Sequence, residues 1–206
     1  SAYLAKAVYT SFRGETQTYG MTGFGSYQRT YDPNEPHRTF ERDADDNTIT
    51  RATDELGNIA DTSYDAFGYP TRIVDHPNGP GTGAAVQTFE YWGPEYFHQI
   101  KQKTDAVGRV TTYVYFTVTG NLKSMTVTDP NPPRGSPGSV TTTYTYTAAG
   151  QPETVTDGLG TVTTYRYDGF GRLLTQTTVS PDGATAAVQT YEYDGAAGNV
   201  AAATIS

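Results

Sequence analysis

The chain has no cysteine among its 206 residues. Without thiols it can form no disulfide, no thiolate metal site and no cysteine nucleophile. Leucine and isoleucine are scarce, at six and five residues. No apolar run approaches the roughly 20 residues that a membrane-spanning helix needs. Acidic residues outnumber basic ones, and the net charge is −8. A negative surface repels phosphate backbones and anionic lipids, so we expect neither nucleic-acid binding nor membrane insertion.

Glycine, proline and tyrosine are abundant instead, with 22, 12 and 17 residues, and threonine is frequent. β-branched and aromatic side chains favour strands, whereas glycine and proline favour turns. No stretch shows the 3.6-residue periodicity of a long amphipathic helix. The composition therefore predicts an all-β protein with many tight turns.

A short turn sequence recurs along the chain, in which an Asp is followed three residues later by a Gly. The fullest copy is Tyr167-Asp168-Gly169-Phe170-Gly171-Arg172-Leu173. The Asp and Gly of five copies are Asp54 and Gly57, Asp65 and Gly68, Asp105 and Gly108, Asp157 and Gly160, and Asp168 and Gly171. Further turn glycines are Gly120, Gly150 and Gly198, and adjacent copies are ten to twelve residues apart. Such a short period indicates one hairpin unit repeated along a sheet.

The chemistry of the unit predicts its local structure. The Asp side chain can accept hydrogen bonds from backbone amides of the turn, and the Gly can adopt a positive φ, which predicts hairpin loops closed by a bulge. Between turns the side chains alternate, so that Val110, Thr112 and Val114 share one face of a strand. We therefore predict an all-β fold, a curved antiparallel β-sheet of repeated hairpins with roughly fourteen to eighteen strands.

Parts of the chain depart from this rhythm. Residues 1–41 lack the pattern and are expected to form an N-terminal β segment, whereas 42–206 form the repeat sheet. The stretch 42–48 is expected to be one more copy, with Asp46 in the place of the glycine. Segments 75–83, 129–138 and 180–183 are expected to be longer hairpin loops, and 84–91 is nearly repeated as 186–193.

The repeated unit resembles the YD repeat of the RHS family, whose pattern is close to Tyr-Asp-x-x-Gly-Arg-Leu followed by a strand rich in Thr and Val. Residues 167–173 match this pattern at every position, and 105–110 and 193–200 match with small departures. The resemblance covers about 42–206. It implies a long antiparallel sheet that spirals. In bacterial RHS proteins, insecticidal toxin C components and teneurins, many such repeats close into a hollow shell, which in the toxins encloses an effector.

For this chain the resemblance implies a non-catalytic, structural segment of such a shell, for encapsulation of a toxin or effector or for surface presentation. It implies a secreted or cell-surface bacterial protein, whose partners are the remainder of the same shell-forming polypeptide and an enclosed effector domain. The self-cleaving aspartyl segment of toxin members has no counterpart in this sequence. We also expect edge-to-edge self-association, because an incomplete sheet has unpaired edge strands.

Residues that could carry chemistry have simpler explanations. The repeated aspartates fit hairpin turns, because the period accounts for every one of them. Asp43, Asp45, Asn47 and Asp54 fit part of a calcium-loop spacing, but Thr48 stands where such a loop needs glycine. His37, His76 and His98 lack ligand spacing and a carboxylate partner in phase. No nucleophile or phosphate-binding motif occurs. We therefore expect no catalytic residue, no metal and no cofactor.

One aromatic cluster departs from the repeat and contains the single tryptophan. Its candidate ligand-binding residues are Tyr91, Trp92, Tyr96 and Phe97. By comparison with 193–195, Trp92 takes the place of a turn Asp. An exposed aromatic platform could stack on sugar rings, which would make the chain a secreted or cell-surface recognition or adhesion module for a glycan or protein. The other hypothesis, which we favour, is that the cluster packs against one edge of the sheet.

Overall fold

The computed structural model describes residues 5–10, 16–21, 27–31, 38–79, 83–194 and 199–205. Regular structure in these ranges is β, apart from the single-turn 3-10 helix η1 (Pro94–Tyr96), which confirms the all-β prediction. No helix in the same ranges has the length and apolar character needed to span a bilayer.

Seventeen strands are present in the described part of the chain. The first eight are β1 (Ala5–Thr10), β2 (Thr16–Met21), β3 (Tyr27–Tyr31), β4 (Thr39–Arg42), β5 (Ile49–Thr53), β6 (Ile59–Tyr64), β7 (Pro70–His76) and β8 (Ala85–Tyr91). The others are β9 (Ile100–Thr104), β10 (Val110–Tyr115), β11 (Leu122–Thr128), β12 (Ser139–Tyr146), β13 (Pro152–Thr156), β14 (Val162–Tyr167), β15 (Leu173–Val179), β16 (Thr185–Asp194) and β17 (Asn199–Ile205).

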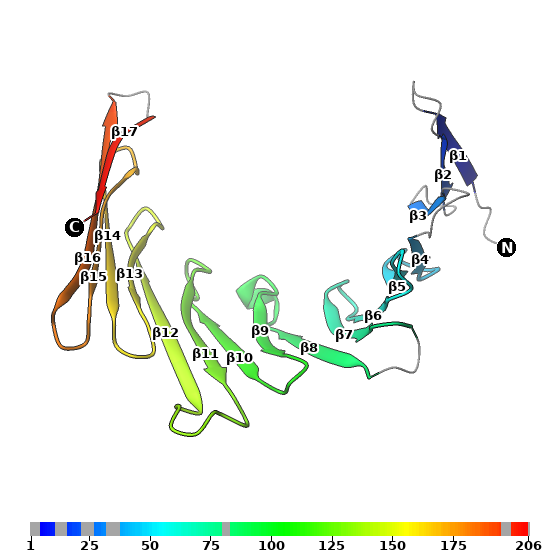
Figure 1. The fold of residues 1–206 in the computed structure, drawn as a ribbon, viewed down its shortest axis with the longest axis horizontal. Helices are drawn as coiled ribbons and strands as arrows, with labels where there is room; N and C mark the ends of the chain where they lie inside the picture. Colours follow the sequence, from blue (N-terminus) through cyan, green and yellow to red (C-terminus); the bar gives the residue numbers. More distant parts are fainter. Residues whose placement is uncertain are drawn as a thin grey trace. The chain divides into compact units, whose positions relative to one another are not determined.

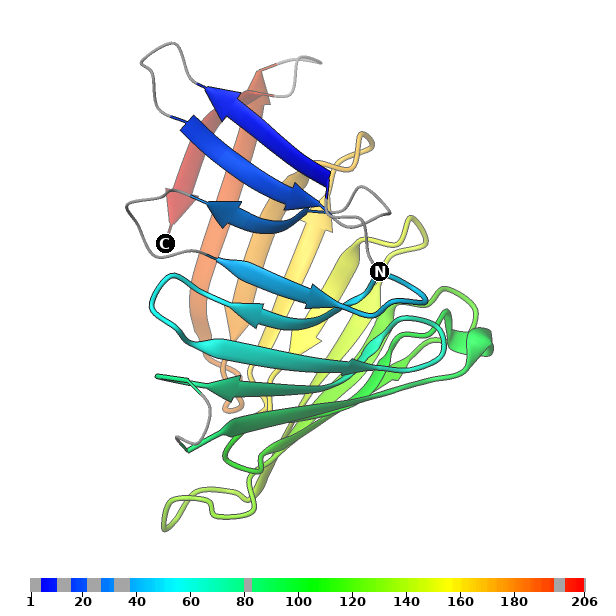
Figure 2. The ribbon, with the colours of Figure 1, turned by 90° about the vertical axis from the view of Figure 1, so that its right-hand side faces the viewer.

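The chain forms two compact units, Ser1–Phe89 with Thr104–Val107, and Glu90–Lys103 with Gly108–Ser206. In the first unit each strand from β1 to β7 pairs antiparallel with the next strand of the chain (Figure 1). In the second, β9 pairs with β10, and each strand from β10 to β16 pairs antiparallel with its successor (Figure 2). Each unit is therefore a sheet of consecutive hairpins, as predicted. The predicted division between 1–41 and 42–206 remains a prediction.

A longer period of four strands underlies the short one. Strands β5, β9 and β13 begin at Ile49, Ile100 and Pro152, which are 51 and 52 residues apart, and the next strands, β6, β10 and β14, begin at the same steps. The near-repeat of 84–91 at 186–193 falls on β8 and β16, which are equivalent strands two periods apart. The repeating structural unit is therefore a pair of hairpins.

Neither unit is built around a conventional core. Val74, at 5% exposure, is the one buried apolar residue among the described side chains. Most other strand residues are half-buried, and they lie on both faces. A residue in a closed core would contact many neighbours from a second layer. Here the contacts come from adjacent strands and from the turns, so cross-strand pairs carry most of the packing.

The two faces of the second unit differ in chemistry. Thr145, Thr154, Thr164 and Thr177 lie directly opposite one another across β12 to β15, so they share one face, the threonine face. Tyr144, Val155, Thr163 and Thr178 form the neighbouring row, which belongs to the opposite face, the tyrosine face. The alternation predicted from sequence thus separates a polar, uncharged row from one that carries aromatic and aliphatic groups.

Candidate functional site

The turn glycines have the left-handed backbone that tight hairpins need. Their φ angles are +82° at Gly57, +84° at Gly68, +83° at Gly108, +89° at Gly160 and +81° at Gly171. In the last of these turns the Asp168 amide donates to the Arg172 carbonyl at 2.9 Å, and the Gly171 amide donates to the Asp168 carbonyl at 3.0 Å. The turns at Asp54, Asp65 and Asp157 have the same pair of bonds. This pattern is a short hairpin loop closed by a glycine bulge.

The aspartates of these turns bind the loop with their carboxylates. In the Asp168 turn, Oδ1 accepts the amides of Phe170 and Arg172, both at 2.9 Å, and Oδ2 accepts Nε of Arg172 at 2.6 Å. Asp54, Asp65 and Asp157 each accept two loop amides, and Asp105 accepts the amide of Val107 at 3.0 Å. Oδ1 of each of these carboxylates therefore accepts hydrogen bonds from the backbone of its own turn.

Hydrogen bonding to the charged form lowers the pKa of three of these groups. The pKa of Asp168 lies below its ordinary value chiefly because of the Arg172 amide, and that of Asp157 chiefly because of the Thr161 amide. The pKa of Asp54 is lowered chiefly by the side chain of Asn58. Carboxylates with lowered pKa values are weaker bases, which is the reverse of what general-base catalysis needs.

The turn at 43–48 corrects one sequence expectation. The left-handed residue is Asn47, with φ +64°, and not Asp46. The Asn47 amide donates to the Asp43 carbonyl at 3.2 Å, so this turn is one residue longer than the Asp168 turn. Asparagine tolerates positive φ better than most residues. Asp46 instead accepts the amide of Thr48 at 2.9 Å. Gly120 closes a turn of the same length, with φ +72°, and Gly198 lies outside the described residues.

The histidines give a second correction. His76 was expected to lack a carboxylate partner, but its Nε2 lies 3.3 Å from Oδ2 of Asp61. Antiparallel pairing of β6 with β7 places Ile59 opposite His76, and Asp61 is two residues along the same face. Asp61 also binds Nε of Arg51 at 2.6 Å. His37 is outside the described residues. Within them, no three His, Asp or Glu side chains converge as metal ligands would.

Sequence reasoning missed a set of tyrosine hydrogen bonds. At the end of a strand, each of five tyrosines donates its hydroxyl to the carbonyl oxygen of the first residue of the preceding strand. The pairs are Tyr64 with Ile49 at 2.8 Å, Tyr115 with Ile100 at 2.9 Å, Tyr146 with Leu122 at 2.9 Å, Tyr167 with Pro152 at 2.8 Å, and Tyr193 with Leu173 at 2.7 Å. The signal in the sequence is the tyrosine that directly precedes the turn.

Two glutamines connect neighbouring turns in a similar way. Nε2 of Gln99 donates to the carbonyl of Gly120 at 2.8 Å, and Nε2 of Gln151 donates to the carbonyl of Gly171 at 2.6 Å. The two glutamines are 52 residues apart and each directly precedes a strand. They are equivalent positions of the four-strand period, so these contacts are part of the repeat.

The aromatic cluster lies at the end of β8 and in the loop that connects β8 to β9. The Trp92 amide donates to the Gln99 carbonyl at 2.9 Å, which is the role of the Asp amide in the short turns. Trp92 is half-buried: its ring centroid lies 5.0 Å from that of Tyr96, and its Nε1 donates to the Tyr113 carbonyl at 3.3 Å. Nζ of Lys101 lies 5.5 Å from the ring centroid. The indole therefore contacts its own loop and the two strands β9 and β10.

Phe97 behaves differently from Trp92. It is 71% exposed, and it and His98 both have positive φ, +55° and +52°. Two consecutive left-handed residues without glycine store backbone strain, which is often found at binding sites. Tyr91 is half-buried at the end of β8, in the place that Tyr146 has at the end of β12. Three of the four predicted residues thus lie in one loop and Tyr91 ends the strand before it, with Trp92 half-buried and Phe97 exposed to solvent.

Comparison with known proteins identifies the repeat. Residues 146–185 match the family described as RHS Repeat. A comparison with curated proteins found no match. The crystal structure of TcdB2-TccC3-TEV has a TM-score of 0.63 at 13% sequence identity, over 97% of this chain and 12% of that chain. The Tc holotoxin pore of Photorhabdus luminescens has a TM-score of 0.49 at 13% identity, over 98% of this chain and 14% of that chain.

The family match confirms the resemblance to the RHS repeat, and the likeness to the TcdB2-TccC3-TEV structure confirms the fold. The matched residues 146–185 include β13, β14 and β15, with the Asp157 and Asp168 turns between them. The chain spans about one eighth of the length of the TcdB2-TccC3-TEV chain it resembles.

Proposed function

We propose that the chain is a stretch of wall in a larger shell built from RHS repeats, which encloses an effector polypeptide. The observation that carries the proposal is the sheet without a core. Among the described side chains only Val74 is a buried apolar residue, and the aromatic and aliphatic groups of the tyrosine face, such as Tyr144 and Val155, are only half-buried. A sheet of this kind is completed by contact with further protein, and a closed shell supplies such contacts.

The use of the polar groups supports a structural role. Aspartates, tyrosines and glutamines recur with the repeat, and the recurring side chains form hydrogen bonds with backbone groups of a turn or a strand end. Catalytic sites instead present a few convergent polar groups in a cleft. A secreted or surface location, as in other RHS proteins, is part of the proposal.

The tips of the turns support further contact with protein. In the five Asp-x-x-Gly turns the residue directly before the glycine is apolar and exposed: Leu56 at 83%, Phe67 at 70%, Val107 at 67%, Leu159 at 74% and Phe170 at 78%. Single exposed apolar residues are ordinary, but a set repeated at five turns is a pattern of contact sites. The remainder of the shell-forming polypeptide is the partner that would share this spacing.

A second candidate function rests on the Trp92 loop. Exposed Phe97, held in a strained left-handed backbone beside the Trp92 and Tyr96 rings, could form the edge of a stacking surface for a glycan. In that case the chain would act as a recognition or adhesion module, and the loop rather than the sheet would carry the function.

The absence of cysteine allows a direct test of the wall. Gln176 and Thr177 are neighbours on β15 and belong to the tyrosine face and the threonine face respectively. Gln176→Cys and Thr177→Cys would each be reacted with a small maleimide and with one that carries a long polyethylene glycol chain. We expect the small reagent to label both variants of the assembled polypeptide and the long reagent to label only one. Equal labelling of both by the long reagent would show that neither face is enclosed.

A further inference from the structure

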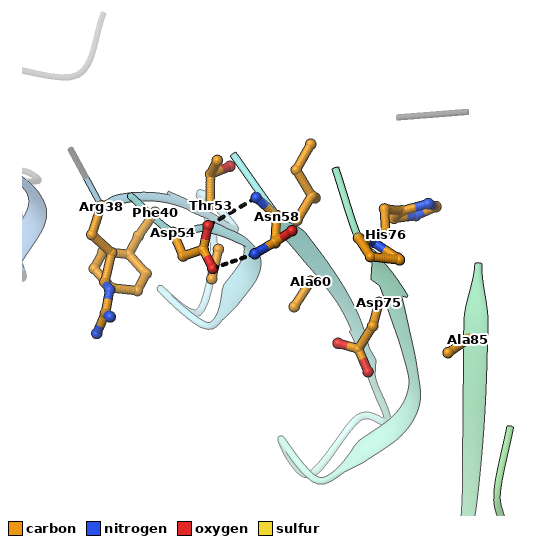
Figure 3. Close-up of a pocket in the computed structure, with 12 residues that line it drawn as sticks. Arg38, Phe40, Thr53, Asp54, Asn58, Ala60, Asp75, His76 and Ala85 are labelled. Atoms are coloured by element: carbon orange, nitrogen blue, oxygen red, sulfur yellow. Dashed lines mark hydrogen bonds between the residues drawn. The ribbon is translucent and has the colours of Figure 1, made fainter. Parts of the chain in front are cut away.

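A hollow of about 520 Å³ lies on one face of the first unit, near the turn between β5 and β6 (Figure 3). Five of the residues that line it form a row of direct cross-strand neighbours on β4 to β8: Phe40, Ala52, Ala60, Asp75 and Ala85. Three of the five are alanines, whose small side chains form the floor of the hollow between larger neighbours. The volume falls in the range of sites that hold small ligands or single side chains.

The hollow is particular to this part of the repeat. Two four-strand periods later, the equivalent row consists of Tyr144, Val155, Thr163, Thr178 and Ala187. Ala52 and Ala60 are thus replaced by the larger Val155 and Thr163. The repeat itself therefore does not require alanine at these positions, and the space above Ala52 and Ala60 is a local property of the first unit.

The hollow contains one carboxylate without a partner. Asp75 is half-buried on the same side of the sheet as Ala60, whereas His76 points to the opposite side (Figure 3). The carboxylate of Asp75 has no hydrogen bond or ion pair with any described residue, in contrast to that of Asp54, which accepts two loop amides and Nδ2 of Asn58. Arg38 also lines the hollow, but it is paired with Glu55 at 3.3 Å. Of the two carboxylates that line the hollow, Asp54 and Asp75, that of Asp75 is therefore the one free to bind an incoming cation.

We infer that this hollow binds a basic side chain of a polypeptide partner, with the aliphatic stem over Ala52 and Ala60 and the cationic head at Asp75. Arginine and lysine place their stems on apolar surface while the charged head stays hydrated, which fits an apolar floor that ends at a carboxylate. The ring of Phe40 at the other end of the row adds an aromatic surface for the stem or the guanidinium. The net charge of −8 favours a cationic partner over an acidic one.

The test uses the methyl groups of the floor as reporters. The 206-residue chain, labelled with 13C in its alanine methyl groups, would be titrated with N-acetyl-arginine methylamide at constant ionic strength. The citrulline analogue has nearly the same stem without the charge and serves as the matched probe. We expect the methyl signals of Ala52 and Ala60 to shift with the arginine probe, and the citrulline probe to bind roughly tenfold more weakly.

Variants separate the site from general charge attraction. Asp75→Asn should weaken arginine binding roughly tenfold, because it removes the partner of the cation and leaves the shape unchanged. Ala60→Leu fills the hollow, keeps the carboxylate and should abolish the shifts at Ala52. Asp129→Asn makes the same charge change in a loop of the second unit and should leave binding unchanged. Equal loss in Asp75→Asn and Asp129→Asn, equal shifts with both probes, or no shifts at all would overturn the inference.

Discussion

The hydroxyl of Tyr146, at the end of β12, donates a 2.9 Å hydrogen bond to the carbonyl oxygen of Leu122, at the start of β11. It satisfies a backbone group at the margin of the sheet, where the ladder of strand hydrogen bonds ends. Tyr64, Tyr115, Tyr167 and Tyr193 do the same at four other strand ends. In a sheet with almost no buried core, contacts of this kind help to hold these five strand pairs in register.

The first prediction removes one of these hydroxyls. Tyr146→Phe should lower the free energy of unfolding by about 1 kcal/mol, because the carbonyl of Leu122 loses a partner in a partly buried position. Tyr144→Phe is the control, since the hydroxyl of Tyr144 makes no hydrogen bond in the described part of the chain. Urea denaturation would compare the three proteins. A loss in Tyr144→Phe equal to that in Tyr146→Phe would contradict a specific role for the strand-end bond.

The second prediction concerns backbone conformation in the Asp168 turn. Gly171 has φ +81°, and an added Cβ would lie 3.3 Å from Nε2 of Gln151. Gly171→Val should cost about 1–2 kcal/mol, because a β-branched residue resists the left-handed region. Gly169, two residues earlier, is not left-handed and has open space around its Cβ position. Gly169→Ala should therefore leave the melting temperature almost unchanged, and an unchanged melting curve for Gly171→Val would refute the assigned role of Gly171.

The turns and strands could be predicted because their causes are local. Asp and Gly three residues apart specify a hairpin loop by themselves, and alternation from Val110 onward specifies a strand. The error at Asp46 arose because the turn has an extra residue, and a fixed spacing from Asp43 then points to the wrong position. The spacing alone could not show that Asn47, one residue later, is the left-handed residue.

The third prediction concerns acid. The pKa of Asp168 is lowered from the ordinary value of 3.8, mainly by the Arg172 amide. The ionised form is therefore favoured in the folded state, so its stabilising effect is complete above the ordinary pKa and is lost as pH falls through the folded pKa. Asp168→Asn should make stability less dependent on pH below about pH 4. Urea midpoints at neutral and acidic pH would measure the slope.

The turn at Thr147 allows the reverse substitution, which adds a turn carboxylate. The Gln151 amide donates to Oγ1 of Thr147 at 3.2 Å, in the place where other turns have a carboxylate. Thr147→Asp should raise stability at neutral pH and make its loss in acid steeper, since the new carboxylate can accept the same amide. Equal acid slopes for Asp168→Asn, Thr147→Asp and the unchanged chain would contradict the role given to the turn carboxylates.

The fourth prediction separates packing from recognition in the Trp92 loop. Because the indole contacts Tyr96 and donates to the carbonyl of Tyr113, Trp92→Ala should cost about 3 kcal/mol. Phe97→Ala, at a 71% exposed position, should change stability by less than about 0.5 kcal/mol. Tryptophan fluorescence would be followed against a panel of polysaccharides. Saccharide binding that Phe97→Ala abolishes without loss of stability would favour the recognition module over the wall.

The long-range features could not be obtained from the sequence in the same way. The partner of Asp61 was missed because His76 is fifteen residues away and joins it only through the register of β6 with β7. The bond from Tyr146 to Leu122 likewise depends on which strands are adjacent. The position of Trp92 in the turn was inferred correctly from 193–195, but its half-buried state depends on the neighbouring strand that carries Tyr113. Which residues lie opposite one another in a sheet depends on the register of its strands, and a short sequence motif does not determine that register.

The central claim is that this chain is one stretch of a longer sheet and is completed by more protein of the same kind. In the described residues β17 pairs with β16, and residues 200–205 are exposed throughout. Unpaired strand edges favour association with another chain, whereas the net charge of −8 opposes it by repulsion that salt screens. The most direct measurement is light scattering across a concentration series at high salt. The account predicts a mass that rises with concentration and falls back toward that of one chain in the double variant Ala201→Lys with Ala203→Lys. A strict monomer at every concentration, with a single cooperative unfolding transition, would show a self-contained domain and contradict the account.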